Sequence, residues 1–171
     1  PLEHSILGRA VANGLLNLSL HNIRDYADEP RHAVDDYPYG GGPGMVMKVE
    51  PLFAAVESVL GVGPPEFPVV LLTPQGKKFT QAEAQRLAAE STLALICGHY
   101  QGVDERVRQY IATDELSIGD YVLTGGELAS MVVVDAVARL LPGALGSPNA
   151  ASADSHAIGL LQHPHYTRPA Q

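Results

Sequence analysis

The chain has 171 residues, of which 46% are apolar and 18% charged, values typical of one globular domain with a hydrophobic core. Nineteen acidic against eleven basic residues leave a formal charge of -8, which argues against general phosphate binding, so any contact with nucleic acid is expected to be local. The single cysteine excludes an intramolecular disulfide and favours a reducing, cytoplasmic location. The apolar runs are far shorter than the roughly 20 residues of a membrane span, so neither a membrane segment nor a signal peptide is expected.

The first part of the chain predicts a helix, a strand and a long loop. Apolar residues recur at helical spacing over residues 2–13, and leucines alternate with polar residues over 16–20 as in a strand. Residues 21–47 carry many charged side chains and end in a glycine-rich segment, which predicts a loop. A loop of this length inside a compact domain is usually functional or disordered.

Helices and strands are expected to alternate after this loop. The predicted strands are 69–72, 93–97 and 121–123, and the predicted helices are 51–60, 80–89, 104–111 and 127–141. Thr80 and Glu83 form a capping box at the start of the second of these helices. Residues 143–158, rich in Ala, Ser, Gly and Pro, predict a flexible linker.

Continuously apolar strands that alternate with helices predict an α/β fold with a parallel sheet and helices on both faces. Ligands of such sheets bind beyond the carboxyl ends of the strands, so the candidate pocket is formed by residues 73–76, 98–102 and 117–126. No Walker phosphate loop or GxGxxG fingerprint is present, which argues against an ATP- or NAD-binding protein. The glycines of these loops either make turns or let backbone groups reach a small ligand such as adenine, and their spacing leaves both interpretations open.

Several polar residues invite a catalytic or metal-binding interpretation. Ser155 lies between Asp154 and His156, but catalytic triads are assembled from separated positions, so a hydrolase is disfavoured. His163 and His165 offer two imidazoles, but no third ligand stands at a suitable spacing, so no metal site is predicted and a surface turn is favoured.

Arg139 is a stronger candidate for a functional residue, because it lies in an otherwise apolar helical stretch and a buried arginine needs an anion. Asp135, four residues earlier, could supply that anion as an ordinary helix pair. The functional alternative is a guanidinium that stabilises charge on a substrate. Cys97 ends a buried strand, where a small core residue is favoured over a nucleophile.

Five blocks of sequence carry a resemblance that covers nearly the whole chain. They are VDDYPYGGGPGM at 34–45, PQG at 74–76, GHYQGVDER at 98–106, SIGDYVLTGGE at 117–127 and HYTRP at 165–169. In this order they closely resemble the bacterial tRNA (guanine-N1)-methyltransferase family. The resemblance implies a SPOUT-class α/β domain with a deep trefoil knot, which strand counting does not propose because knots are rare.

The resemblance also implies an obligate homodimer that binds S-adenosylmethionine in the knot crevice at the interface. The positions that match the family's cofactor site would hold the cofactor largely through backbone groups. These positions are Pro74, Gly98, Tyr100, Gln101, Ile118, Gly119, Asp120, Tyr121, Val122, Leu123, Gly125 and Gly126.

The family methylates N1 of the guanosine just 3′ of the anticodon in tRNA. This nitrogen carries a proton at neutral pH, and Asp154 matches the family's general base, which the partner subunit's linker presents. Arg139 matches the residue that stabilises negative charge on O6. Asp35 and Ser155 match positions that contact the target base, which must be unstacked, and the family suggests that Mg2+ assists deprotonation.

The chain departs from the family pattern at two cleft positions and at its ends. Gln101 stands where Glu is common and His99 where Arg is common, a change that could weaken cofactor binding. Because the first strand and the C-terminal tRNA-binding domain of the family are missing, we expect a truncated chain, with a catalytic domain at 1–142 and a linker leading to the missing domain at 143–171. The alternatives are a catalytically silent, dimeric S-adenosylmethionine-binding domain and, more remotely, an α/β nucleotide-binding protein unrelated to RNA.

Overall fold

The computed structural model describes residues 2–28, 30–147 and 150–168. Its centre is a parallel sheet in the order β4-β3-β5, formed by Ala94–Cys97, Val69–Lys78 and Asp114–Ser117. A separate two-stranded antiparallel hairpin pairs β1, Asp35–Asp36, with β2, Val46–Met47. The helices are α1 at Ser5–Ala12, α2 at Val49–Leu60, α3 at Gln81–Ala88, α4 at Glu105–Tyr110, α5 at Glu127–Ala138 and α6 at Ala150–Ala153, with a 3-10 turn, η1, at Ile23–Tyr26.

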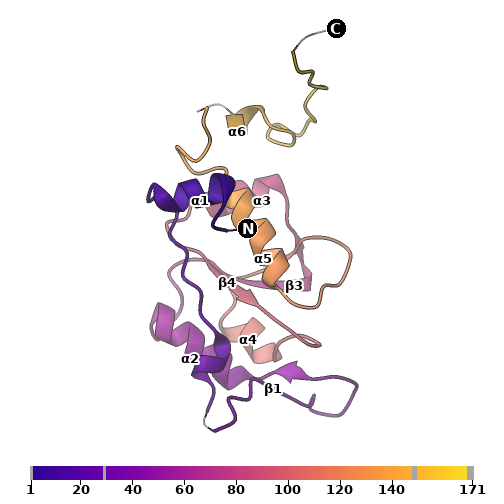
Figure 1. The fold of residues 1–171 in the computed structure, drawn as a ribbon. Coiled ribbons are helices and arrows are strands. Elements are labelled where there is room, and N and C mark those ends of the chain that lie inside the picture. The colour runs from indigo at the N-terminus through magenta and orange to yellow at the C-terminus, as the bar shows by residue number, and fades with distance from the viewer. Residues whose placement is uncertain (1, 29, 148–149, 169–171) are drawn as a thin grey trace.

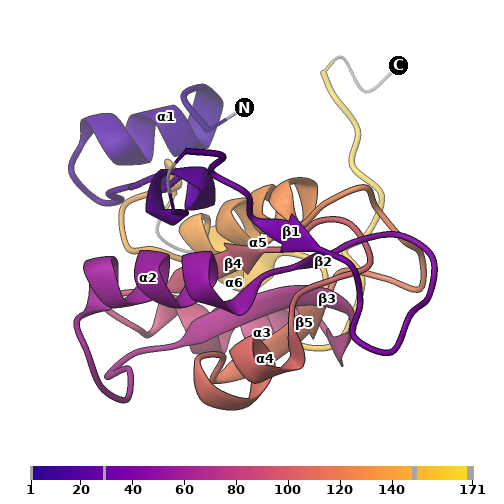
Figure 2. The same ribbon diagram turned by 90° about the horizontal axis from the view of Figure 1, so that it is seen from below.

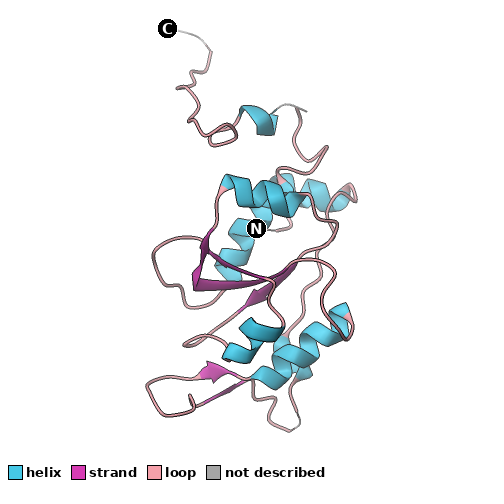
Figure 3. Cartoon of the chain, turned by 180° about the vertical axis from the view of Figure 1, so that it is seen from behind, coloured by secondary structure: helices cyan, strands magenta, loops and turns pink. Residues whose placement is uncertain are grey.

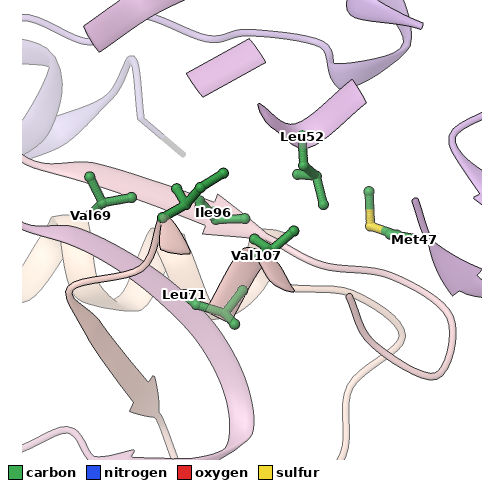
Figure 4. Packing of buried hydrophobic residues seen from close by; sticks show 7 residues of the cluster. Met47, Leu52, Val69, Leu71, Ile96 and Val107 are labelled. Atoms are coloured by element: carbon green, nitrogen blue, oxygen red, sulfur yellow. The ribbon is translucent and has the colours of Figure 1, made fainter. Parts of the chain in front are cut away.

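Helices cover both faces of the parallel sheet, as the α/β prediction requires (Figures 1 and 3). The reason lies in β3, whose first four residues are all buried and point alternately to the two faces. Val69 and Leu71 pack on the side of α2 and α4, and this core includes Met47, Leu52, Ile96 and Val107 (Figure 4). Val70 and Leu72 pack on the side of α3 and α5.

Side-chain caps begin two of the helices where the sequence predicts them. Thr80 Oγ1 accepts a hydrogen bond from the backbone N–H of Glu83 at 3.4 Å, which starts α3. The Glu83 carboxylate binds Lys77 and Arg86, so the reciprocal half of the expected capping box is not among its contacts. Asp104 accepts from the N–H of Arg106 at 2.9 Å and starts α4.

Two strand predictions are wrong, and in both cases the segment does not pair with a neighbouring strand. Residues 16–20 alternate leucines but form no ladder, and Leu20 is largely exposed. Residues 121–123 are irregular, and the third parallel strand is β5, which precedes them. The sequence of β5, DELS, hides this strand because it is an edge strand in which only Leu116 and Ser117 are buried.

β3 also continues past its predicted end. Residues 73–76, expected to be a loop, form an irregularity within the strand, and the pairing with β5 shifts register between Leu72 and Lys77. Pairing resumes with Lys77 opposite Leu116 and Lys78 opposite Ser117. This bulge lies where the paired part of β4 ends. It is therefore at the carboxyl edge of the sheet, as predicted for residues 73–76.

α1 stands away from the sheet, at the corner where the chain begins (Figure 2). At the other extreme, α6 and the segment after it lie beyond α1 and α3, at the opposite end of the molecule from the β1–β2 hairpin (Figures 1 and 3). The predicted linker therefore contains a short helix. No helix in the described part of the chain has the length and apolar character needed to cross a membrane.

Candidate functional site: a glycine-rich cleft at the carboxyl edge of the sheet

A cleft with a volume of about 500 Å³ opens where the three parallel strands end. Its walls come from the bulge at 73–76, the loop at 98–102 and the loop at 117–126, which are the three segments predicted to form the pocket. The volume falls within the range of small-molecule sites. The sequence argument from the parallel sheet therefore locates the pocket correctly.

Glycines let the backbone segments around the cleft approach one another closely. A Cβ on Gly76 would lie 2.5 Å from the backbone nitrogen of Leu116, so only glycine lets the bulge pass beside β5. A Cβ on Gly126 would lie 2.7 Å from the Cα of Cys97. The N–H of Gly126 donates to the carbonyl of Gly98 at 2.9 Å, which ties the start of α5 to the end of β4. These contacts favour the interpretation in which the glycines serve the cleft and do more than form turns.

The cleft brings together eleven of the twelve residues that the family resemblance assigns to the cofactor. Tyr100 among them has a backbone φ of 61°, a left-handed conformation that a non-glycine residue rarely adopts. The twelfth, Asp120, is not among the lining residues, and its carboxylate binds the ammonium of Lys78 at 3.0 Å. Strain at Tyr100, inside the cleft, is typical of a functional position.

The loop of the β1–β2 hairpin is held against one wall of the cleft. The N–H of Gln101 donates to the carbonyl of Met45 at 3.0 Å, and the N–H of Met47 donates to the carbonyl of Gly102 at 2.9 Å. Gly44 has a φ of 81°, and a Cβ there would lie 2.8 Å from Gln101 Cγ. Asp35, the predicted contact of the target base, lies on this hairpin, so the hairpin connects a predicted substrate residue with one wall of the cleft.

The cleft is also lined by three charged residues that were not expected there from the sequence: Glu105, Arg108 and Glu115. Arg108 Nε donates to the Glu105 carboxylate at 2.8 Å, and Arg108 Nη1 donates to Glu115 at 3.2 Å. The hydrogen bond from Arg108 lowers the pKa of Glu105, and the two carboxylates raise the pKa of Arg108. The i, i+3 spacing of Glu105 and Arg108 looks like an ordinary helix pair, and only the fold turns it toward the cleft.

The two predicted catalytic residues meet each other, away from the cleft. Arg139 Nη2 donates to Asp154 Oδ2, and both side chains are partly buried. The anion that Arg139 needs is thus supplied by the Asp154 carboxylate, whereas the helix neighbour Asp135 accepts only the backbone N–H of Arg139, through its carbonyl, among the described contacts. Arg139 follows the C-terminal end of α5, whereas Gly126 and the cleft lie at its start, so the twelve residues of the helix separate Arg139 from Gly126 by about 20 Å.

Ser155 lies beside Asp154, and its Oγ accepts a hydrogen bond from the N–H of Gln162 at 3.0 Å. This segment follows α6, and β1, which carries Asp35, lies at the opposite end of the molecule (Figure 1). Within one chain, Arg139 therefore contacts Asp154, and the hairpin with Asp35 contacts the cleft. The Arg139–Asp154 pair does not reach the cleft of the same chain.

The remaining candidates have structural explanations. Burial raises the pKa of the Cys97 thiol, which is typical of a core residue and unlike an activated nucleophile. The rings of His163 and His165 lie 4.7 Å apart and are tilted. Within the described residues, no three His, Cys, Asp or Glu side chains gather in a way that could hold a metal ion.

Comparisons with known proteins agree with this geometry. A family model described as tRNA (Guanine-1)-methyltransferase TrmD matches residues 1–171. The chain is 60% identical to a tRNA (guanine-N(1)-)-methyltransferase of Dehalococcoides mccartyi over 99% of its own length and 68% of that protein. It is 58% identical to the protein of that name in Geotalea uraniireducens, over 100% and 69% of the two lengths.

The structure matches the crystal structure of tRNA (m1G37) methyltransferase from Aquifex aeolicus with a TM-score of 0.78 and 37% identity, covering 98% of this chain and 69% of that one. The fold is therefore that of the SPOUT class, which implies the trefoil knot expected from the resemblance. On the family match and the identities together, the chain belongs to the tRNA (guanine-N1)-methyltransferase family.

Proposed function

We propose that this chain transfers a methyl group from S-adenosylmethionine to N1 of the guanosine that lies 3′ of the anticodon in tRNA. The cleft carries the proposal, because its lining contains eleven of the twelve positions that match the family's cofactor site. Family membership over the whole chain supports tRNA as the substrate. Such a reaction, together with the single cysteine, favours the cytoplasm as its location.

The lining of the cleft fits an adenosine-containing cofactor. Glycines expose backbone N–H and C=O groups, which can recognise the edge of an adenine, and Ile118, Leu123 and Ala129 add apolar surface for its ring. The loops that meet at Gly98 and Gly126 leave no room for side chains between them. The bound cofactor would supply an electrophilic methyl group on a sulfonium.

The protein's own task in the reaction is to remove one proton and to stabilise one charge. Asp154 would accept the N1 proton of guanine, which makes N1 a nucleophile. Arg139 would then stabilise the negative charge that grows on O6 as the proton leaves. The contact between the two side chains supports a joint role. The Arg139 guanidinium orients the Asp154 carboxylate and lies close to the place where that carboxylate would act.

A homodimer would complete the site. Arg139, which binds Asp154, lies about 20 Å along α5 from Gly126 at the cleft of its own chain, which is too far for the pair to act on a ligand held there. α5 also carries an apolar face, with Leu128 and Val132 about half exposed, beside a groove shared with α1. If two copies pack these faces across a two-fold axis perpendicular to α5, the two helices run antiparallel, and the Arg139 end of one lies beside the cleft of its partner.

The family also suggests that Mg2+ assists the reaction. We propose that any such ion comes from solution or is carried by the tRNA. The described residues gather no metal-binding cluster, so we assign no ligand set and no step to it.

The experiment that tests the function is methyl transfer from radiolabelled S-adenosylmethionine to a tRNA transcript, with and without Mg2+. We expect label at N1 of the guanosine 3′ of the anticodon and none in a matched transcript with adenosine at that position. Cofactor binding by a dimer without any transfer would instead identify a silent binding domain. Equal labelling of the two transcripts would refute the assigned target.

A further inference from the structure

A side-chain pair joins the two main loops at the edge of the cleft. His99 follows β4 through Gly98, and Glu127 is the first residue of α5. His99 Nε2 lies 2.5 Å from Glu127 Oε1, and the two side chains are 45% and 56% exposed. His99 lines the cleft, whereas Glu127 is not among the lining residues.

The backbone around this pair is built to hold the two side chains together. His99 forms an antiparallel bridge with Gly125, and the N–H of Gly126 donates to Gly98 at 2.9 Å. A Cβ on Gly125 would lie 2.6 Å from His99 Cε1 and would also collide with the Glu127 carboxylate. The missing side chain at Gly125 therefore leaves the space in which His99 meets Glu127.

We propose that His99 and Glu127 form a clasp that fixes the loops at 98–102 and 117–126 in the geometry that binds S-adenosylmethionine. Both are positioning residues, because they act through Gly98, Gly125 and Gly126, whose backbone lines the cleft. The inference rests on the proposed function, since it names what holds that cofactor site in shape.

The clasp joins an imidazole nitrogen of His99 to a carboxylate oxygen of Glu127. The other charged residues of the cleft are Arg108 and its two carboxylate partners, Glu105 and Glu115, which bind one another.

The remaining neighbours of His99 are uncharged or act on its backbone. The ring of Tyr100 lies tilted with its centroid 6.0 Å away, and Met47 Sδ accepts the backbone N–H of His99 at 3.2 Å. Glu127 lies at the N-terminus of α5, where the helix dipole favours its negative charge.

The test is calorimetric titration of S-adenosylmethionine, with no tRNA present and at one fixed pH. We expect His99→Ala and Glu127→Gln each to weaken binding by about 2- to 5-fold, the range of an exposed ion pair. The double variant should be no weaker than either single variant, because the two residues act as one unit. His99→Arg should keep the wild-type affinity, because a guanidinium can also bind the Glu127 carboxylate.

A matched control is His21→Ala, which removes an imidazole whose partners, Ser19 and Tyr26, lie outside the cleft, and we expect it to change nothing. Wild-type affinities in both His99→Ala and Glu127→Gln would overturn the clasp and leave the proposed function standing. Additive losses in the double variant would also overturn it. A folded wild-type chain that binds no S-adenosylmethionine would overturn the proposed function together with the clasp.

Discussion

Replacing Gly126 by alanine should separate the end of β4 from the start of α5. The added Cβ would lie 2.7 Å from the Cα of Cys97 and 3.1 Å from the nitrogen of Gly98, whereas ordinary contacts begin at 3.4 Å. The backbone must therefore move by about 0.7 Å. The φ of Gly126 is -79°, which any residue adopts, so the expected cost is steric and not conformational.

Overpacking of this kind costs about 1–3 kcal/mol. Because Gly98 and Gly126 both line the cleft, the displacement deforms the cofactor site as well as the fold. If the whole cost falls on binding, the affinity for S-adenosylmethionine drops by about 5- to 150-fold. Any part that falls on folding instead lowers the melting temperature.

Calorimetric titration with S-adenosylmethionine and thermal unfolding, both on the same preparation, measure the two parts. The control is Gly146→Ala, because a Cβ at that exposed glycine meets nothing within 4 Å. We expect the control to match the wild type in both assays. If Gly126→Ala also matches the wild type in both, the close approach of β4 and α5 does not shape the cleft, and the reasoning is refuted.

Three further predictions concern other parts of the chain. Asp154→Asn should lower methyl transfer by about 10²- to 10⁴-fold, with unchanged cofactor affinity by calorimetry; near-full activity would exclude Asp154 as the base. Glu83→Gln should destabilise the fold by about 1–3 kcal/mol in urea unfolding at neutral pH, because Glu83 is buried and binds Lys77 and Arg86. These partners lower the pKa of Glu83 below 4.5, so its stabilisation is full above that pH and is lost as pH falls through the lowered pKa; a variant with the wild-type acid slope would contradict this. Leu128→Asp should convert a dimer to monomers in sedimentation, because Leu128 is exposed on the apolar face of α5; an intact dimer would place the interface elsewhere.

The amino-acid sequence was sufficient to predict the class of fold and the place of the pocket. The buried run at 69–72 and the apolar segment at 93–97 each carry their own signal, because strands covered on both faces must be apolar throughout. From parallel strands the cleft at their carboxyl ends follows directly. The strand at 16–20 failed because alternation gives a segment two faces but does not supply a neighbouring strand.

Edge strands and bulges were beyond the reach of pattern alone. β5 carries charged residues at its two positions outside the core, Asp114 and Glu115, and its identity as a strand comes from pairing with β3. The bulge at 73–76 exists because β3 must keep pairing with β5 on the far side of it, a long-range requirement that no local residue announces.

The sequence by itself determined which residues can act as bases, as cations or as sites of close backbone approach, since each carboxylate, guanidinium group and glycine is identified by its residue type. Only the tertiary structure decided which of them meet across elements: Arg139 with Asp154, His99 with Glu127, and Arg108 with Glu115 at the cleft. The physical reason is that a side-chain contact depends on distances set by packing between elements far apart in the chain. Spacing along the sequence reports such distances only within a single helix or strand.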